Sequence, residues 1–184
     1  MTVSRVRIHG RGGQGVVTAA RLLAPAMYEE GRNVQAIPEF GVERRGAPVK
    51  SYLKYTDSED EVIPSRTYVH EPDWIICMDE TLLETEHVTE GLADDGIVLV
   101  NTSDAPGEVD LDADRVATLD ATAIANRIIG TNIVNTILLG GFAAATGEVS
   151  VDSVIEASTE KFGVGEDNEN VEAIEAGYDQ TQVA

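Results

Sequence analysis

The stretch VSRVRIHGRGGQGVVTAARLLAPAM, residues 3–27, indicates the fold class of this chain. Residues 3–8 alternate apolar and basic side chains in the manner of a β-strand, and a glycine-rich turn follows at residues 10–15. Apolar residues then recur at helical spacing, and Gly31 is typical of the residue that follows a helix end. A strand, a glycine turn and a helix in this order are typical of α/β folds with parallel sheets.

The rest of the chain continues this alternation of strands and helices. The pattern predicts strands at residues 34–37, 49–55, 74–78, 96–100 and 115–119, and helices at about 79–90, 121–129, 133–145, 150–162 and 171–178. We therefore expect an α/β fold, specifically a three-layer α/β/α sandwich with a largely parallel, Rossmann-like sheet, and a single domain over residues 1–184. In such a sheet the loops that follow residues 8 and 37 should lie on one rim.

Composition limits the kinds of site that the chain can hold. Its 184 residues are long enough to bury a core, and its one cysteine, Cys77, excludes a disulfide framework and a four-cysteine iron–sulfur cluster. The three histidines are scattered without metal-ligand spacing, so we expect no metal site. No apolar leader is visible, and the longest apolar stretch, residues 133–145, is too short to span a bilayer. We therefore expect a cytoplasmic protein that does not enter a membrane.

Charge is high and unevenly distributed along the chain. The formal net charge is −20, which disfavours a nucleic-acid-binding protein. Residues 1–54 nevertheless hold nine of the 13 cationic side chains and only four of the 33 acidic ones. The acidic surface and the scarcity of lysine predict a salt-adapted, halophilic protein, with an ordinary acidic protein as the alternative. The basic N-terminal third predicts contact with an anionic ligand or an acidic partner surface.

The first motif is GRGGQG at residues 10–15, between the predicted strand and helix. Glycines there permit a close approach of the backbone, and free amides at a helix N-terminus favour an anion. We expect cofactor-binding contacts from Gly12, Gly13, Gln14 and Gly15. The alternative is a tight turn that binds nothing.

The second motif is the loop PEFGVERRGAP at residues 38–48. Its adjacent Arg44 and Arg45 have guanidinium groups suited to phosphate or carboxylate, so both are candidate cofactor-binding residues. The alternatives are a solvated basic loop and internal ion pairs with Glu39 and Glu43.

Glu39 also bears on a second hypothesis, a free-standing NAD(P)-binding oxidoreductase. A dinucleotide fold needs an acidic residue at the end of its second strand to bind ribose, and Glu39 is roughly at that place. It follows Pro38 and enters a loop rich in arginine, so the match is poor. A third hypothesis is an assembly protein of similar fold without enzymatic activity.

Both motifs resemble signatures of a known family. RGGQGVVTAA at residues 11–20 and FGVERRGAP at residues 40–48 are similar to the two signatures of the gamma subunit of 2-oxoacid:ferredoxin oxidoreductases. Further similar segments cover nearly the whole chain in order, at residues 71–73, 92–96, 135–140 and 168–178. The forms of the two signatures are most similar to the pyruvate branch, with the 2-oxoisovalerate branch close to it.

The resemblance implies a reaction shared between several chains. In this family a 2-oxoacid such as pyruvate, coenzyme A and oxidised ferredoxin give acyl-CoA, carbon dioxide and reduced ferredoxin. Thiamine diphosphate with Mg²⁺ and [4Fe-4S] clusters would lie on alpha, beta and possibly delta subunits, because this chain has neither a Gly-Asp-Gly motif nor cluster cysteines. The resemblance therefore implies no catalytic residue and no cofactor bound by this chain alone, with coenzyme A as co-substrate. The basic rim would face partner subunits near the phosphates of coenzyme A or thiamine diphosphate.

Overall fold

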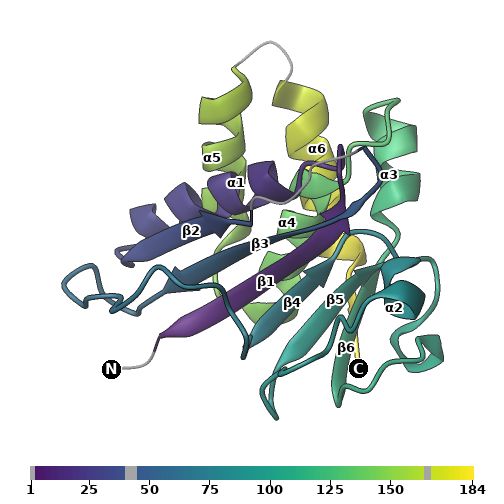
Figure 1. Cartoon of the computed structure of the whole chain (residues 1–184). Helices are drawn as coiled ribbons and strands as arrows, with labels where there is room; N and C mark the ends of the chain where they lie inside the picture. The colour runs from purple at the N-terminus through teal and green to yellow at the C-terminus, as the bar shows by residue number, and fades with distance from the viewer. Residues whose placement is uncertain (1–2, 40–44, 164–166) are drawn as a thin grey trace.

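The computed structural model describes residues 3–39, 45–163 and 167–184, and its strands form one mixed sheet (Figure 1). The strand order is β2-β3-β1-β4-β5-β6-β7. β1, β4, β5 and β6 run parallel, whereas β3 is inserted antiparallel between β1 and β2, and β7 is antiparallel to β6. The strands are β1 (Ser4–Arg11), β2 (Val34–Pro38), β3 (Pro48–Tyr55), β4 (Trp74–Cys77), β5 (Ile97–Asn101), β6 (Arg115–Leu119) and β7 (Gln182–Val183).

Helices connect the strands and cover mainly one face of the sheet. The apolar helix that the sequence predicts at residues 133–145 is buried almost all round, and it lies between the sheet and the outer helices. The α/β class and the predominantly parallel sheet are confirmed. The helices are α1 (Val16–Glu29), α2 (Leu82–Thr85), α3 (Ala121–Ile128), α4 (Asn135–Thr146), α5 (Val151–Phe162) and α6 (Asp167–Gln180), with a short 3₁₀ turn, η1 (Pro106–Glu108).

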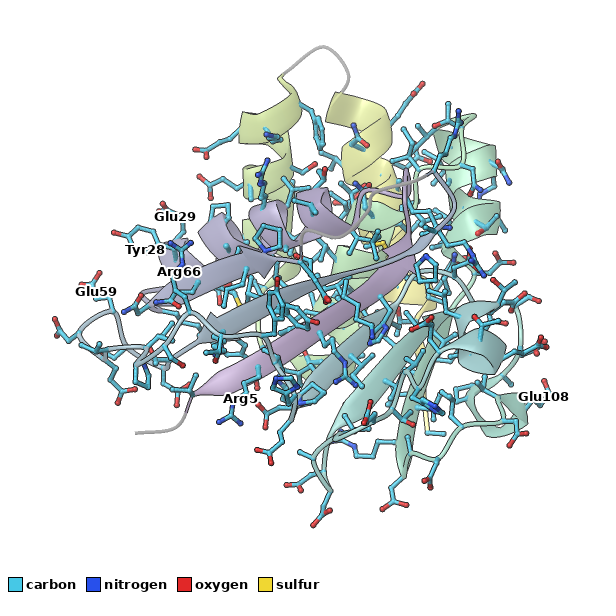
Figure 2. All side chains as sticks on the ribbon, in the orientation of Figure 1. Arg5, Tyr28, Glu29, Glu59, Arg66 and Glu108 are labelled. Carbon is cyan, nitrogen blue, oxygen red and sulfur yellow. The ribbon has the colours of Figure 1, made fainter. Side chains whose placement is uncertain are left out.

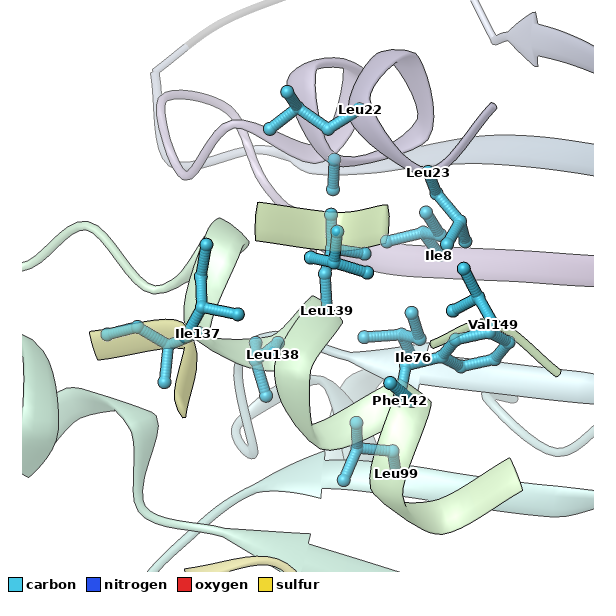
Figure 3. Close-up of a cluster of buried hydrophobic side chains, with 14 of the residues drawn as sticks. Ile8, Leu22, Leu23, Ile76, Leu99, Ile137, Leu138, Leu139, Phe142 and Val149 are labelled. Carbon is cyan, nitrogen blue, oxygen red and sulfur yellow. The ribbon is translucent and has the colours of Figure 1, made fainter. Parts of the chain in front are cut away.

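The two helical layers of the sandwich are unequal. On one face, β1, β4 and β5 contribute Ile8, Ile76 and Leu99 to a large core that includes Phe142 of α4 and Leu23 of α1 (Figure 3). On the other face, a smaller cluster is covered by the short helix α2 and by loops (Figure 1). The buried members of that smaller cluster are Ile75, Cys77, Leu82, Val88, Val98 and Val100.

The prediction of a helix from residue 79 to about residue 90 is wrong in its length. Only Leu82–Thr85 is helical, and turns follow it. Glu86, the residue after α2, has an extended backbone with φ −127° and ψ 148°, so the chain leaves the helix there. The segment that follows brings the carbonyls of Val88 and Glu90 to the Arg7 guanidinium, from which they accept hydrogen bonds at 2.8 and 2.7 Å.

The polar side of β1 is also buried. Arg7 and His9 both face away from α1, and the Arg7 Nε–H donates to His9 Nε2 at 2.9 Å. An accepting Nε2 requires a neutral imidazole with its proton on Nδ1. Burial, aided by the positive charges of Arg7 and Lys50, lowers the pKa of His9 to about 3. His9 is thus a structural histidine that stays neutral over the physiological range.

A mostly buried polar network supports the end of the sheet where β1 begins and β3 ends. Glu148, which follows α4, accepts hydrogen bonds from Arg32 at 2.9 Å and from the Tyr55 hydroxyl at 2.8 Å. The Trp74 indole donates to the same hydroxyl at 2.8 Å, and the Arg32 guanidinium lies 5.0 Å from the Tyr55 ring centroid. Glu148 therefore joins the loop after α1 to strands β3 and β4.

We expect Glu148→Leu to lower the free energy of unfolding by about 2 kcal/mol, because it leaves Arg32 and Tyr55 without their shared acceptor. The matched control is Glu86→Ala, which breaks the more open Lys50–Glu86 ion pair at 3.7 Å. We expect that control to cost less than about 1 kcal/mol. Urea denaturation of both variants measures the difference, and equal losses would contradict a special role for the Glu148 network.

Candidate anion-binding site

The glycine turn joins β1 to α1 in a conformation that requires glycine at two positions. Gly13 has φ +100° and Gly15 has φ +81°, both in the left-handed region. Gly15 is the N-cap residue of α1, and it has no side chain to cap the helix. The amides of the first three helical residues, Val16 to Thr18, therefore have no acceptor in the described parts of the chain. These amides and the helix dipole make the turn suitable for an anion.

Close packing also accounts for two of the glycines. A Cβ on Gly10 would lie 2.5 Å from Val16 Cγ2, and one on Gly15 would lie 2.5 Å from Asn135 Nδ2. Close packing alone therefore explains why residue 10 is glycine, and it partly explains why residue 15 is glycine. Gly13 is different, because it is exposed, and a Cβ there would meet just one atom of the described residues within 4 Å, Arg45 Cγ at 3.9 Å.

The end of the second motif, residues 45–48, lies directly against the glycine turn, because β3 begins opposite the end of β1. Arg11 is paired with Pro48 in the ladder, the Gly12 amide donates to the Ala47 carbonyl at 2.8 Å, and the Gly46 amide donates to the Gly12 carbonyl at 3.0 Å. β3 is antiparallel to both neighbours, so β1 and β2 end on the same rim, as the sequence predicts. The end of the second motif and the glycine turn, which are separate in the sequence, therefore lie side by side on this rim.

A cleft of about 460 Å³ lies between these two segments. Gly12, Gly13, Gly15 and Arg45 line it, together with Glu39. Arg45 is exposed and has no hydrogen-bond or ion-pair partner in the described part of the chain. The cleft thus presents free amides and an unpaired guanidinium. Arg44 lies outside the described residues.

Gln14 is turned away from this cleft and is bonded within the chain. Its Oε1 accepts the Arg11 amide proton at 2.7 Å, and its Nε2 donates to Asp79 Oδ2 at 2.9 Å. The Arg11 guanidinium lies 3.3 Å from the same carboxylate oxygen and donates to the Thr81 hydroxyl at 2.6 Å. The structure therefore brings Gln14 to the turn, but as a side chain that braces it from behind.

Asp79, at the end of β4, is the hub of these contacts. Partial burial alone would raise its pKa, but hydrogen bonds from Thr81 and Gln14 and the charge of Arg11 hold the pKa of Asp79 below its ordinary value. Asp79 is the first residue of the helix predicted at residues 79–90, but that helix begins at Leu82 with Thr81 as its N-cap residue, and Asp79 accepts the Thr81 amide proton at 3.1 Å. The sequence analysis does not predict the contacts of Asp79 with the glycine turn. The position of Asp79, at the end of a buried strand next to β1, is the signal that could have revealed these contacts.

Glu39 is a second residue whose surroundings the sequence does not reveal. The Tyr52 hydroxyl, on β3, donates a short hydrogen bond to the Glu39 carboxylate. Tyr52 also stacks on Tyr68, with ring centroids 5.1 Å apart, and burial together with Glu39 raises the pKa of Tyr52. Tyr52 therefore binds the Glu39 carboxylate within the sheet. Neither a ribose nor an arginine of the second motif is needed to keep this carboxylate in place.

The chain matches a known protein family. The family model described as pyruvate ferredoxin/flavodoxin oxidoreductase matches residues 5–180. The chain belongs to this family. The match spans both motifs and nearly every helix and strand, and it confirms the resemblance found in the sequence.

Relatives in the pyruvate ferredoxin/flavodoxin oxidoreductase family cover the full length of the chain or most of it. Pyruvate synthase subunit PorC of Methanosarcina barkeri is 51% identical over 156 residues, which are 84% of each chain. The pyruvate/ketoisovalerate oxidoreductases common subunit gamma of Thermococcus kodakarensis is 46% identical over 182 residues, 97% of each chain. The crystal structure of pyruvate oxidoreductase subunit PORC from Thermotoga maritima has a TM-score of 0.86 at 33% identity, covering 100% of this chain and 99% of that one.

Two other features bear on the chemistry of this family member, namely its possible metal ligands and its single cysteine. In residues 3–39, 45–163 and 167–184, no three His, Cys, Asp or Glu side chains gather in a way that could hold a metal ion. Burial raises the pKa of the Cys77 thiol to about 12, and the thiol donates to the Asp79 carbonyl at 3.2 Å. Cys77 is thus a core residue rather than a nucleophile. No helix in the described residues has the length and apolar character needed to cross a membrane.

Proposed function

We propose that this chain is the gamma subunit of a 2-oxoacid:ferredoxin oxidoreductase that converts pyruvate and coenzyme A to acetyl-CoA and carbon dioxide with reduction of ferredoxin. The names and full-length similarity of the relatives support this proposal. Some of those relatives are shared between pyruvate and ketoisovalerate enzymes, so 2-oxoisovalerate is the second candidate substrate. The comparisons do not favour a free-standing NAD(P)-dependent enzyme.

The structure offers a further argument against the dinucleotide alternative. In doubly wound folds, a nucleotide binds where the strand order reverses, which here is between the ends of β1 and β4. Gln14 and Arg11 from β1 and its turn reach Asp79 from β4 across this position. The chain's own side chains therefore occupy the place that a dinucleotide would need.

Partner subunits are part of the proposal. The donor set of this chain does not fit thiamine diphosphate with Mg²⁺ or a [4Fe-4S] cluster, because its single cysteine is buried and the described residues contain no cluster of metal ligands. We assign these cofactors to alpha, beta and possibly delta subunits, with ferredoxin as the electron acceptor. We also place the complex in the cytoplasm of a salt-adapted organism, since the net charge of −20 and the low lysine content favour solubility at high ionic strength.

The cleft is the basis of the role that we propose for this chain within the complex. Arg45 and the free amides at the start of α1 line the cleft together with Glu39, whose carboxylate is bonded to Tyr52, and Arg45 forms no ion pair among the described residues. We propose that Gly12, Gly13, Gly15, Arg44 and Arg45 bind the phosphates of coenzyme A at the interface with a partner subunit. Gln14 supports this site through the turn. Contact with thiamine diphosphate or with an acidic partner surface would use the same charges, and these are the alternatives.

The decisive experiment is kinetic and uses the assembled complex. We expect Arg45→Ala, and likewise Arg44→Ala, to raise the KM for coenzyme A about tenfold with a smaller change in kcat, because a charge-assisted phosphate contact contributes about 1.5 kcal/mol or more. The matched control is Arg66→Ala. Arg66 is exposed in the loop after β3, toward the end of the sheet where β1 begins (Figure 2).

Native size-exclusion chromatography of the same variants separates the alternatives. Dissociation of the Arg45→Ala complex without a change in KM would assign the charge to an acidic partner surface. Unchanged assembly and unchanged kinetics would contradict any role of the cleft.

The identity of the complex has an independent test. We expect the tagged chain to be captured at high salt together with the other subunits, and the captured material to reduce viologen in a reaction that requires coenzyme A. Comparing several 2-oxoacids in that assay decides between pyruvate and 2-oxoisovalerate. A chain that elutes alone would contradict the proposed function.

A further inference from the structure

We propose that Asp79 is a positioning residue that holds the glycine turn from behind, so that the free amides at the start of α1, which follows the turn, stay at the cleft. The proposal rests on the proposed function for the identity of the ligand, coenzyme A. Asp79 does not line the cleft and lies on the opposite side of the turn from Arg45. It would therefore act on the ligand through the turn and not by direct contact.

One arm of the brace runs through Gln14. Asp79 Oδ2 accepts the Gln14 Nε2 hydrogen at 2.9 Å, and Gln14 Oε1 accepts the Arg11 amide proton at 2.7 Å. The backbone amide of Gln14 also donates to the Arg11 carbonyl at 3.0 Å. Asp79 thus fixes the orientation of the Gln14 side chain, which closes the turn together with the Gln14 backbone amide.

The other arm runs through Thr81 and Arg11 to the second motif. Asp79 Oδ1 accepts the Thr81 hydroxyl hydrogen at 2.5 Å, and that hydroxyl accepts from Arg11 Nη2 at 2.6 Å. Arg11 Nη1 then donates to the Gly46 carbonyl at 3.1 Å. A single carboxylate therefore reaches both the glycine turn and the residue next to Arg45.

The contacts through Asp79 act on a part of the turn that packing does not hold. Gly12 is held by main-chain hydrogen bonds and Gly15 packs against Asn135, but Gly13 between them is exposed and has no side chain to restrict its conformation. Binding that orders a loose loop spends part of its free energy on that ordering. A turn that is held before the ligand arrives binds more tightly, and this advantage is what we assign to Asp79.

A simple helix-capping role would look different. The helix after Asp79, α2, has only four residues, and Thr81 is the only residue there whose amide donates to the Asp79 side chain. The remaining side-chain partners, Gln14 and Arg11, belong to β1 and its turn. A cap would therefore affect α2 alone, whereas a brace would affect the turn and the second motif.

The test compares Asp79→Ala with Asp79→Asn in the assembled oxidoreductase, with Glu84→Ala as the matched control. Glu84 is an exposed carboxylate on α2 that makes none of these contacts. We expect Asp79→Ala to raise the KM for coenzyme A at least fivefold while kcat stays within twofold. Asp79→Asn keeps an acceptor oxygen for Gln14 or Thr81 and should recover at least half of the loss.

Hydrogen–deuterium exchange in the same complexes gives a readout that does not depend on the ligand. The amides of Arg11, Gly12 and Gly46 are hydrogen-bonded in the brace and in the contact between the motifs. We expect Asp79→Ala to accelerate their exchange at least tenfold and Glu84→Ala to leave it unchanged.

The outcomes separate this inference from the function on which it rests. Unchanged exchange at those amides in Asp79→Ala would overturn the brace. Faster exchange with an unchanged KM for coenzyme A would overturn the positioning role while leaving the proposed function standing, provided that Arg45→Ala raises that KM. If Arg45→Ala also leaves the KM unchanged, the proposed function fails and the positioning of coenzyme A fails with it.

Discussion

Replacing Gly140 with alanine is expected to remove a substantial part of the stability of the fold. Gly140 lies in α4 where this helix crosses α6, and a Cβ there would be 2.3 Å from the Ile174 carbonyl oxygen. The crossing is reciprocal, because a Cβ on Gly177 of α6 would lie 2.4 Å from the Ile137 carbonyl oxygen. Main-chain atoms cannot rotate out of the way as side chains can, so the helices would have to separate.

Separation of α4 and α6 would open the middle of the core. We expect a loss of about 3 kcal/mol or more, the upper range for overpacking, out of a typical total of about 5–15 kcal/mol. Thermal or urea unfolding measures the loss. The control is Gly107→Ala, since nothing lies within 4 Å of its Cβ position and its φ is not positive. Equal stability of the two variants would show that the crossing tolerates a methyl group.

Acidification should destabilise the fold through His9. The folded protein keeps this imidazole neutral down to a pKa of about 3, whereas an unfolded histidine binds a proton near pH 6.5. Between these pH values the unfolded state holds the extra proton, so the free energy of unfolding falls as the pH falls. At pH 4.5 this one group should cost about 2 kcal/mol relative to pH 7.

A substitution that preserves the hydrogen bond isolates this effect. The side-chain oxygen of His9→Gln can still accept from Arg7 Nε but cannot titrate, so we expect its stability to depend less on pH between 7 and 4.5. His70→Gln is the control, because His70 is exposed. If the pH dependence of unfolding is the same in His9→Gln and in the parent protein, His9 does not titrate as its burial implies.

Sequence patterns predict most elements of this fold for physical reasons that hold locally. Alternation identifies β1 and β3, the apolar run identifies β4, and continuous hydrophobicity identifies α4 as a central helix. Helix α5 begins where Ser150 predicts it, since its hydroxyl accepts the Ser153 amide proton at 3.1 Å. Each of these features depends on a few neighbouring residues.

Features that depend on strand order are harder to predict. The short α2 is tied to a contact between distant parts of the chain, because the backbone leaves the helix at Glu86 and the segment that follows brings the carbonyls of Val88 and Glu90 to Arg7 on β1. The two-residue strand β7 has no pattern of its own and exists because β6 offers an edge. The helix and strand propensities of the local sequence therefore predict neither feature.

The candidate site divides in the same way. Its glycines and Arg45 are visible in the sequence because they form recognisable motifs. The roles of Gln14, Asp79 and Glu39 are not, since each depends on a partner from another strand that only the sheet register brings near. Gln14 belongs to a visible motif, yet its side chain braces the turn from behind and does not line the cleft.

The join between the two motifs consists of main-chain hydrogen bonds, from Gly12 to Ala47 and from Gly46 to Gly12. Such bonds are indifferent to the side chain at an adjacent position, so mutation at residue 45 can alter charge without altering the frame. Evolution can therefore retune what this rim attracts by exchanging one exposed residue. Protein engineers who want to change the preferred ligand could begin at the same position and leave the architecture intact.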